Sequence, residues 1–321
     1  MNIVISDGMG FIGRSLCAAL CQEGHRVMLF TRRKEEVQRS CGLTVSAVEW
    51  NGLDAEDWEH CLDGADAIVN LAGAPIADGR WTDVRKRLLM ESRVLSTRLL
   101  VETLSRRSSK PRTPINASGI GYYGASDDRV LDEGAACGQD FLPYPCILWE
   151  AEALRAAELG VRLVILRTGM VLEQDGGALP KMLLPFRFFT GGPILPGTQW
   201  VSWIHRQDHI GLIKWVLTTP SVSGPVNAVA PEAVTMNQFC DALGRILQRL
   251  SWLAVRGFAL HTALGNWGCN EHGPTGHFGE GALRGICLAL PDAGTSLAGD
   301  YDEGMKEGGQ APSLSPGRRQ L

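Results

Sequence analysis

The chain has 321 residues, of which 45% are hydrophobic, 21% charged and 7% aromatic, and its 31 basic and 35 acidic side chains leave a net charge of −4. This composition is typical of a globular protein and excludes a disordered, collagenous or coiled-coil chain over most of the length. The mildly acidic balance gives no support for a nucleic-acid or membrane-surface partner. No apolar run is long enough to predict a transmembrane helix.

The N-terminus and the cysteines bear on location. The first residues lack the basic segment and the long apolar segment of a signal peptide. The nine cysteines are odd in number and irregular in spacing, which favours reduced thiols. Cys269, His272, His277 and Cys287 do not have the spacing of a zinc site. We therefore expect a cytoplasmic protein without a metal site.

The first half of the chain alternates predicted strands and helices. Apolar runs predict strands at 3–5, 27–30, 45–50, 67–72, 114–118 and 162–166. Helical periodicity predicts helices at 14–23, 82–106 and 149–159. Because the strands are continuously apolar and separated by helices, we expect a parallel sheet covered on both faces. Right-handed crossovers make it α/β, with a doubly wound parallel sheet, that is, a Rossmann fold.

The second half changes character twice. Residues 173–200 are rich in Gly and Pro and predict a loop-dominated lobe, before helical patterns return at 208–219 and 236–249. From about Gly265 the periodicity disappears and glycines recur. We expect a dinucleotide-binding domain at 1–172, a small C-terminal substrate lobe at 173–264 interleaved with the end of the sheet, and a poorly ordered Gly-rich tail at 265–321.

A glycine motif lies between the first predicted strand and the first predicted helix. Its sequence is Gly8-Met9-Gly10-Phe11-Ile12-Gly13, which fits G-x-G-x-x-G in the required place. Such glycines allow a tight turn, approach of the backbone to a pyrophosphate and close packing of the helix, whose N-terminus then faces the phosphates. A purely structural glycine turn is the alternative. We expect these residues to bind a dinucleotide.

The end of the second strand indicates which dinucleotide. The strand ends in Phe30-Thr31-Arg32-Arg33, where an NAD site would have an acidic residue for the ribose 2′-hydroxyl. The planar guanidinium of arginine suits a 2′-phosphate. A solvated basic turn is the alternative, but with the glycine motif upstream this segment favours NADP(H) over NAD.

Further motifs follow in order along the chain: Asn70-Leu71-Ala72-Gly73, Arg80-Trp81-Thr82, Ser92-Arg93, Gly121-Tyr122-Tyr123-Gly124, Leu166-Arg167-Thr168-Gly169, Trp203-Ile204-His205 and Gly224-Pro225-Val226-Asn227. With these motifs the chain resembles the extended short-chain dehydrogenase/reductases, and within them the epimerase family proteins of short-chain dehydrogenase/reductase family 39U. The resemblance covers about residues 1–250.

The resemblance implies NADP(H) as cofactor and a small-molecule substrate that it does not identify. By position it implies cofactor contacts from Thr31, Arg32 and Arg93, and places Leu71 and Ala72 beside the cofactor. Two segments depart from the family pattern. Asp7 replaces a glycine of Gly-Gly-Thr-Gly, and the family's segments after about residue 250 are not recognisable. Asp7 brings a carboxylate close to the expected pyrophosphate, where like charges repel.

Catalytic residues are less clearly marked. The superfamily uses a Tyr-x-x-x-Lys pair with a Ser or Thr, and this chain has no Lys in the window before Trp149. Ser118, at the end of a strand, is a candidate hydroxyl partner, and Tyr122 or Tyr123 could supply a phenol; Tyr123 is the preferred candidate. A structural role for the three is the alternative. His205 with Asp208 could form an acid–base pair, but a tie between lobe and sheet is favoured.

Two functions remain open. One is an NADP(H)-binding epimerase- or oxidoreductase-like protein that acts on a small molecule. The other is a non-catalytic NADP(H)-binding sensor or scaffold. The absent Tyr-x-x-x-Lys pair favours the second, and the dinucleotide and lobe motifs favour the first.

Overall fold

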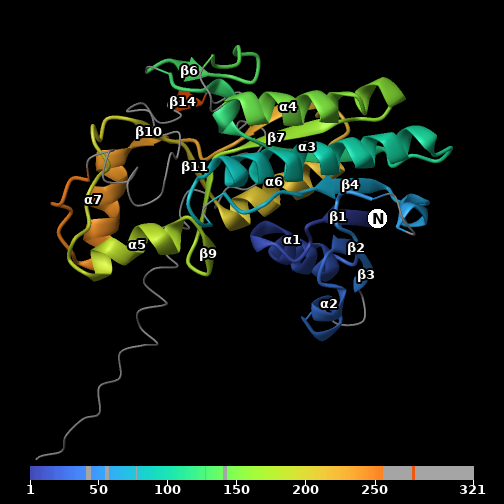
Figure 1. Ribbon diagram of the computed structural model, residues 1–321, viewed down its shortest axis with the longest axis horizontal. Helices are drawn as coiled ribbons and strands as arrows, with labels where there is room; N and C mark the ends of the chain where they lie inside the picture. Colours follow the sequence, from blue (N-terminus) through green and yellow to red (C-terminus); the bar gives the residue numbers. More distant parts are fainter. Residues whose placement is uncertain are drawn as a thin grey trace, which may run out of the picture.

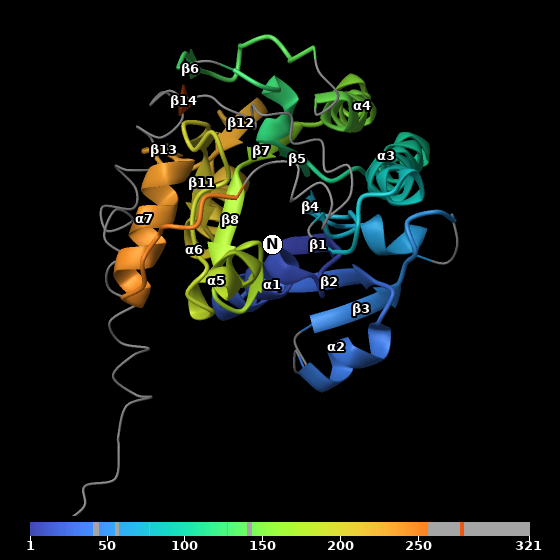
Figure 2. The ribbon, with the colours of Figure 1, turned by 60° about the vertical axis from the view of Figure 1, so that its left-hand side comes forward.

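The computed structural model describes residues 1–40, 45–54, 58–76, 78–126, 128–139 and 143–255, and the backbone of 277–278. At its centre is a seven-stranded sheet in the order β12-β7-β5-β4-β1-β2-β3, in which all neighbours are parallel (Figures 1 and 2). Its strands are β1 (Asn2–Ser6), β2 (Arg26–Thr31), β3 (Val45–Glu49), β4 (Ala67–Asn70), β5 (Thr113–Gly119), β7 (Val164–Thr168) and β12 (Gly224–Ala228). The predicted doubly wound parallel sheet is confirmed.

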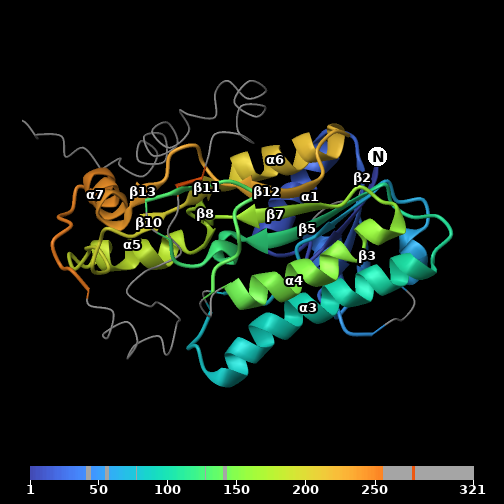
Figure 3. The same ribbon diagram turned by 90° about the horizontal axis from the view of Figure 1, so that it is seen from above.

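Helices cover both faces of this sheet. Figures 2 and 3 show α1 (Phe11–Gln22) and α6 (Arg206–Thr218) on one face and α3 (Asp83–Arg106) and α4 (Pro143–Leu154) on the other. A short helix of seven residues, α2 (Lys34–Ser40), lies between β2 and β3 in the chain. On the α1–α6 face the core includes Leu16, Leu20 and Ile213. The opposite face buries an aromatic group of Phe30, Trp50 and Trp58, with ring centroids 5.3–5.9 Å apart.

The strand order places a topological switch point between β1 and β4. The chain leaves β1 through α1 toward β2, and leaves β4 through α3 toward β5 on the other side. In open α/β sheets, ligands bind outside the carboxyl ends of the strands at this point. The loops that follow β1 and β4 therefore define where a functional site belongs.

A smaller lobe lies at one end of the sheet. It contains α5 (Leu179–Arg187), α7 (Met236–Leu247) and short strands: β8 (Met170–Glu173), β9 (Gly176–Gly177), β10 (Trp200–Val201), β11 (Trp203–His205) and β13 (Val234–Thr235). Its own core includes Leu172, Leu183, Phe186, Phe239 and Leu243. Between these segments the chain returns to the sheet through α6 and β12, so lobe and sheet are interleaved in sequence (Figure 1).

Three helices differ from the predictions, and prolines explain two of them. The segment 173–200 was predicted to be loop-dominated, but it contains α5, whose buried Leu179, Leu183 and Phe186 follow helical spacing. Helix α4 begins at Pro143, six residues before its predicted start. Proline is tolerated in the first turn of a helix, where its missing N–H has no partner to lose. The short α2 has no counterpart among the predicted elements.

The predicted Gly-rich tail lies outside the described residues, except for β14 (His277–Phe278). This two-residue strand pairs in parallel with β6 (Val130–Leu131). Among the described helices, none combines the length and the apolar character needed to cross a membrane.

The lobe contacts the start of α1 through Phe11. A Cβ built on Gly176 or Gly177 would lie 2.6 or 2.9 Å from the Phe11 ring, so the ring packs directly on this glycine backbone. The guanidinium carbon of Arg206 lies 5.0 Å from the centroid of the same ring. The first residue of α1 is thus held between two parts of the chain that lie far beyond it in sequence.

This contact yields a stability prediction with a matched control. Gly24 and Gly177 both have positive φ, +79° and +70°, but a Cβ on Gly24 meets nothing within 4 Å. Gly24→Ala should therefore cost only the left-handed strain, about 1–2 kcal/mol. Gly177→Ala should cost at least about 1 kcal/mol more, because its methyl group crowds Phe11. Urea unfolding measures both, and equal losses would contradict the packing that we describe.

Candidate functional site

The three glycines of the motif after β1 have no room for side chains. A Cβ on Gly13 would lie 2.5 Å from the Asp7 carbonyl oxygen and 2.8 Å from the Gly8 Cα. The Gly10 N–H donates to the Asp7 carbonyl at 2.8 Å, which closes the turn. Helix α1 starts directly afterwards, with no side-chain cap and no acidic residue in its first turn. Its N-terminal amides and helix dipole therefore favour an anion at this position.

Asp7 is the unusual residue of this loop. Its φ is +53°, a left-handed conformation that glycine adopts more easily than other residues. A Cβ on Gly10 would lie 2.5 Å from the Asp7 Oδ2, so the carboxylate lies against this glycine. Burial raises the pKa of Asp7 to about 6, although the guanidinium groups of Arg32, Arg33 and Arg93 lower it in part. The site thus holds a half-buried carboxylate within a positive environment.

The end of β2 supplies the cationic side of the site. Thr31 is buried, and its hydroxyl accepts a hydrogen bond from the Arg33 N–H at 3.1 Å. Arg33 forms an ion pair with Glu36 at 3.2 Å. Arg32 is exposed, and within the described part of the chain no hydrogen bond or ion pair engages it. Of the two neighbouring guanidinium groups, Arg32 is therefore the one available to a phosphate.

A buried polar network fixes the end of β4. The Ser6 hydroxyl accepts hydrogen bonds from the N–H groups of Leu71 and Ala72, at 3.0 and 3.2 Å, and donates to Asn70 at 2.5 Å. The Asn70 side-chain amide in turn donates to Asn116 at 2.7 Å. These bonds satisfy polar groups that have no access to water and hold the strand end in one conformation. Leu71 and Ala72 thus lie beside the loop that carries Asp7.

Arg93 is anchored to protein rather than left free. Its Nη1 and Nη2 donate to the carbonyl oxygens of Leu89 and Ala74, at 2.8 and 3.0 Å. Its guanidinium carbon lies 5.3 Å from the centroid of a Trp149 ring, and burial lowers the pKa of Arg93. It therefore positions the segment after β4 and contributes a positive charge, with its two terminal nitrogens already bonded to carbonyl oxygens.

Ser118 belongs to a buried ion-pair network. Its hydroxyl donates to Glu150 Oε1 at 2.6 Å. Arg167 donates to both oxygens of the same carboxylate, from Nε at 3.0 Å and from Nη2 at 2.9 Å. The side chains of Glu150 and Arg167 are only 6% and 5% exposed. The Ser118 hydroxyl thus lies beside a charged carboxylate that a guanidinium already neutralises.

Tyr123 lies at the other end of this network. Its hydroxyl donates to Asn227 Oδ1 at 2.7 Å and accepts from Arg167 Nη1 at 2.9 Å. Burial raises the pKa of Tyr123, although the bond from Arg167 lowers it in part. The phenol is therefore less acidic than usual, which is the opposite of what a general base at neutral pH requires. The neighbouring Tyr122 stacks on Arg167, whose guanidinium carbon is 3.5 Å from the ring centroid.

The structure brings Ser118 and Tyr123 into one network but not into a Tyr-x-x-x-Lys arrangement. The window where the lysine would lie forms the first turn of α4, with Cys146 half-buried. A Cβ on Gly119 would lie 3.7 Å from the Cys146 sulfur, and burial raises the pKa of this thiol to about 11. Cys146 therefore cannot replace the positive charge of a lysine.

His205 and Asp208 lie outside this network. The His205 ring nitrogen Nδ1 accepts from the Gln207 N–H at 3.3 Å and caps the start of α6. Its Nε2 lies 3.7 Å from Glu173. His205 thus caps α6 and joins two strands of the lobe, β8 and β11, and the predicted tie between lobe and sheet stays a prediction. Within the described ranges, no group of three His, Cys, Asp or Glu side chains could hold a metal ion.

Sequence reasoning missed the centre of the buried network. Arg167 was noted only within a longer motif and Glu150 was not singled out, although each carried a signal. Arg167 is a charged residue within an apolar strand, and Glu150 lies on the buried face of α4 next to Trp149. A charge in such a place is normally paired, and two opposite charges in neighbouring elements predict one another.

Known proteins share this architecture. Residues 3–229 match the family model described as the NAD dependent epimerase/dehydratase family. The chain is 38% identical over 270 residues to the epimerase family protein SDR39U1 homolog, chloroplastic, of Arabidopsis thaliana, which covers 83% of this chain and 76% of the relative. It is 37% identical to the epimerase family protein YfhF of Bacillus subtilis, over 83% of this chain and 86% of that protein.

Solved structures agree with these relatives. The crystal structure of the human epimerase family protein SDR39U1 (isoform 2) with NADPH has a TM-score of 0.75 and 29% identity, and the match covers 90% of this chain and 94% of that one. UDP-glucuronic acid 4-epimerase from Bacillus cereus, in complex with UDP-glucuronic acid and NAD, has a TM-score of 0.66 at 18% identity, over 80% and 85% of the two chains. At this lower identity the similarity shows the fold alone.

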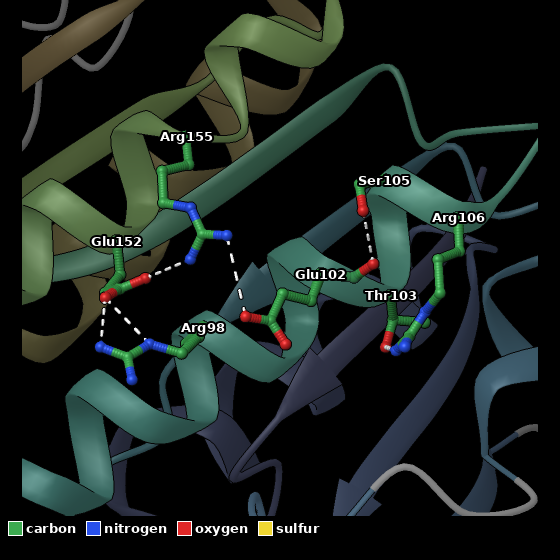
Figure 4. A network of polar contacts seen from close by, with 7 residues as sticks. All are labelled: Arg98, Glu102, Thr103, Ser105, Arg106, Glu152 and Arg155. Carbon is green, nitrogen blue, oxygen red and sulfur yellow. Dashed lines mark hydrogen bonds and ion pairs between the residues drawn. The ribbon is translucent and has the colours of Figure 1, made fainter.

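The buried ion pair can be tested against an exposed one on the same helix. Glu150→Gln removes the charge that compensates Arg167 and should destabilise the protein by about 3–5 kcal/mol. Glu152→Gln, two residues further on, affects pairs with the exposed Arg98 and Arg155, both at 2.6 Å (Figure 4). That control should cost no more than about 1 kcal/mol. Chemical denaturation compares them, and a loss below about 1 kcal/mol for Glu150→Gln would contradict the network.

Asp7 should destabilise the folded protein in a pH-dependent way. Its folded pKa of about 6 lies above its ordinary value, so the folded state binds more protons than the unfolded state between about pH 4 and 6. Stability should therefore fall as the pH rises through this window. Asp7→Asn should add on the order of 1–2 kcal/mol above pH 7 and little below pH 4. Asp7→Gly should add about 1 kcal/mol more at every pH by relieving the backbone strain.

Thermal or urea unfolding across this pH range measures both variants of Asp7. If Asp7→Asn changed the stability equally at pH 4 and pH 8, the aspartate would not titrate as described.

Proposed function

The chain belongs to the NAD dependent epimerase/dehydratase family, and we propose that it binds NADPH at the carboxyl ends of β1, β2 and β4. The observation that carries this proposal is the start of α1, which has no side-chain cap and packs closely on the glycines of the preceding loop. The exposed guanidinium of Arg32 lies at the end of the neighbouring strand β2. The NADPH in the crystal structure of the human relative supports the same choice.

The residues of the site fit this cofactor in their chemistry. Gly8, Gly10 and Gly13 let the loop pack closely against the start of α1, and the first amides of α1, from Phe11 and Ile12 onward, favour the charge of a diphosphate. Thr31 and Arg32 would hold the adenosine ribose and its 2′-phosphate, while Leu71 and Ala72 would lie beside the cofactor and Arg93 would add charge. When bound, NADPH supplies a hydride for transfer.

We further propose a small-molecule substrate and an epimerase- or oxidoreductase-like reaction, with Ser118 and Tyr123 nearest to the chemistry. Their hydroxyls lie at the carboxyl end of β5 and in the turn that follows it. In this role Ser118 would donate a hydrogen bond to a substrate oxygen instead of to Glu150. Tyr123 would have to exchange its partner Asn227 for the substrate.

A specific observation favours the second candidate, a non-catalytic NADPH-binding sensor or scaffold. The hydroxyls of Ser118 and Tyr123 both form hydrogen bonds with buried partners. The Cys146 thiol, whose pKa is raised, lies in the segment where the superfamily has its lysine. The fluorescence of bound NADPH discriminates the two functions. Sugar nucleotides or carbonyl compounds that change or consume this signal would indicate catalysis, and an unchanged signal across such a panel would indicate a sensor.

Cytoplasmic location remains part of this proposal, since it rests on the composition and the cysteines alone. Fractionation of cells that express the full chain, followed by immunoblotting, tests it directly.

Cofactor preference tests the proposed site. Arg32→Ala should weaken NADPH binding about tenfold or more, because a charge-assisted hydrogen bond to phosphate contributes about 1.5–3 kcal/mol. NADH binding should change little, since NADH has no 2′-phosphate. Arg32→Asp should shift the preference toward NADH.

The matched control for Arg32 is Arg33→Ala, one residue on, where the guanidinium already pairs with Glu36. Its effect on NADPH should be several-fold smaller. Fluorescence titration gives the affinities, and equal affinity of the natural protein for NADPH and NADH would refute the assignment.

A further inference from the structure

The Asp7 carboxylate lies against Gly10, directly before the start of α1. Its Oδ2 lies 2.5 Å from where a Gly10 Cβ would be, on the side of the loop next to the start of α1. It does not cap this helix, whose N-terminus receives no side-chain hydrogen bond. An anion that approaches the amides of α1 across Gly10 therefore meets a second anion there.

The charged groups that lower the pKa of Asp7 are all positive. They are Arg32 and Arg33, at the end of β2, and Arg93, on α3. The N-terminus of α1 adds the positive end of its dipole. None of the three guanidinium groups comes within ion-pair distance of Asp7 in the described structure. They stabilise the ionised carboxylate only by longer-range electrostatic attraction, and the same positive charges would attract a cofactor phosphate.

We propose that Asp7 couples NADPH binding to the uptake of one proton, which the carboxylate takes from solvent as the diphosphate of the cofactor settles beside Gly10. One O–H bond forms, and no other covalent bond changes. The proposal rests on the proposed NADPH site and adds a property that follows from this chain's own aspartate.

Like charges in contact within a half-buried site cannot both remain ionised, so the weaker acid is the one that is protonated. A diphosphate is a far stronger acid than the Asp7 carboxyl, which burial has already weakened. The protonated carboxyl can then donate a hydrogen bond to a phosphate oxygen instead of repelling it. In the free protein above pH 7 the carboxylate is mostly ionised, so binding must add the proton.

Calorimetric titration of the full chain with NADPH, at pH 7.5 in two buffers of different ionisation enthalpy, measures this uptake. We expect about one proton per NADPH bound by the natural protein, falling toward zero near pH 5. The dissociation constant should rise by up to about tenfold per pH unit above pH 6. Asp7→Asn keeps the shape of the side chain and should bind NADPH several-fold more tightly at pH 7.5.

The difference between the natural protein and Asp7→Asn isolates Asp7, because the 2′-phosphate of NADPH titrates near pH 6 in both. Asp241→Asn, an exposed carboxylate on α7, is the control for lost charge and should leave the uptake unchanged. Equal proton uptake by the natural protein and Asp7→Asn would overturn the coupling while leaving the NADPH site intact. NADPH binding by Asp7→Asn alone would overturn the coupling, because the natural protein would then exclude the cofactor instead of taking up a proton. No binding by either protein would overturn both proposals.

Discussion

The close approach of α1 to the loop after β1 is the constraint on which the rest of the site depends. Gly13 has no room for a Cβ, which would lie 2.5 Å from one backbone atom and 2.8 Å from another. This contact fixes the distance between the start of α1 and the sheet, so that the first backbone N–H groups of α1 lie at the switch point. Because backbone atoms make the contact, no rotamer change can relieve it.

A second constraint is polar and lies deeper. The carboxyl ends of β4, β5 and β7 carry Asn70, Asn116, Ser118 and Arg167, and all of them are buried. In a medium of low dielectric, each donor and acceptor must find a partner, and each partner then fixes the next. The result is a rigid base beneath the site. The same network engages the hydroxyls of Ser118 and Tyr123 in hydrogen bonds with Glu150 and Asn227.

The sequence was most informative where one physical requirement dominates. Burial on both faces makes the strands apolar, so the doubly wound parallel sheet could be predicted from the alternation of apolar strands and helices, with a glycine turn after the first strand. The pattern failed where two requirements compete. In α4 and α5, prolines indicate a loop, yet Pro143 and Pro180 lie in the first turns of helices that tertiary packing stabilises.

The site could be predicted less completely than the fold. The departure at Asp7 was visible in the sequence, but its left-handed backbone and its three positive neighbours depend on elements up to α3. Likewise, the candidate roles of Ser118 and Tyr123 were judged one residue at a time. Whether a hydroxyl is free depends on residues far along the chain, here Glu150 and Asn227.

The ring of Phe11 connects the two halves of the molecule. Phe11 is the first residue of the helix that offers its amides to an anion, and its ring packs on Gly176 and Gly177 of the lobe and against Arg206 at the start of α6. A ligand that rotates the lobe and a ligand that reorders the helix start act on this same contact. Reciprocity then requires that each changes the affinity of the other by an equal factor. The order in which two such ligands arrive would leave their combined free energy unchanged.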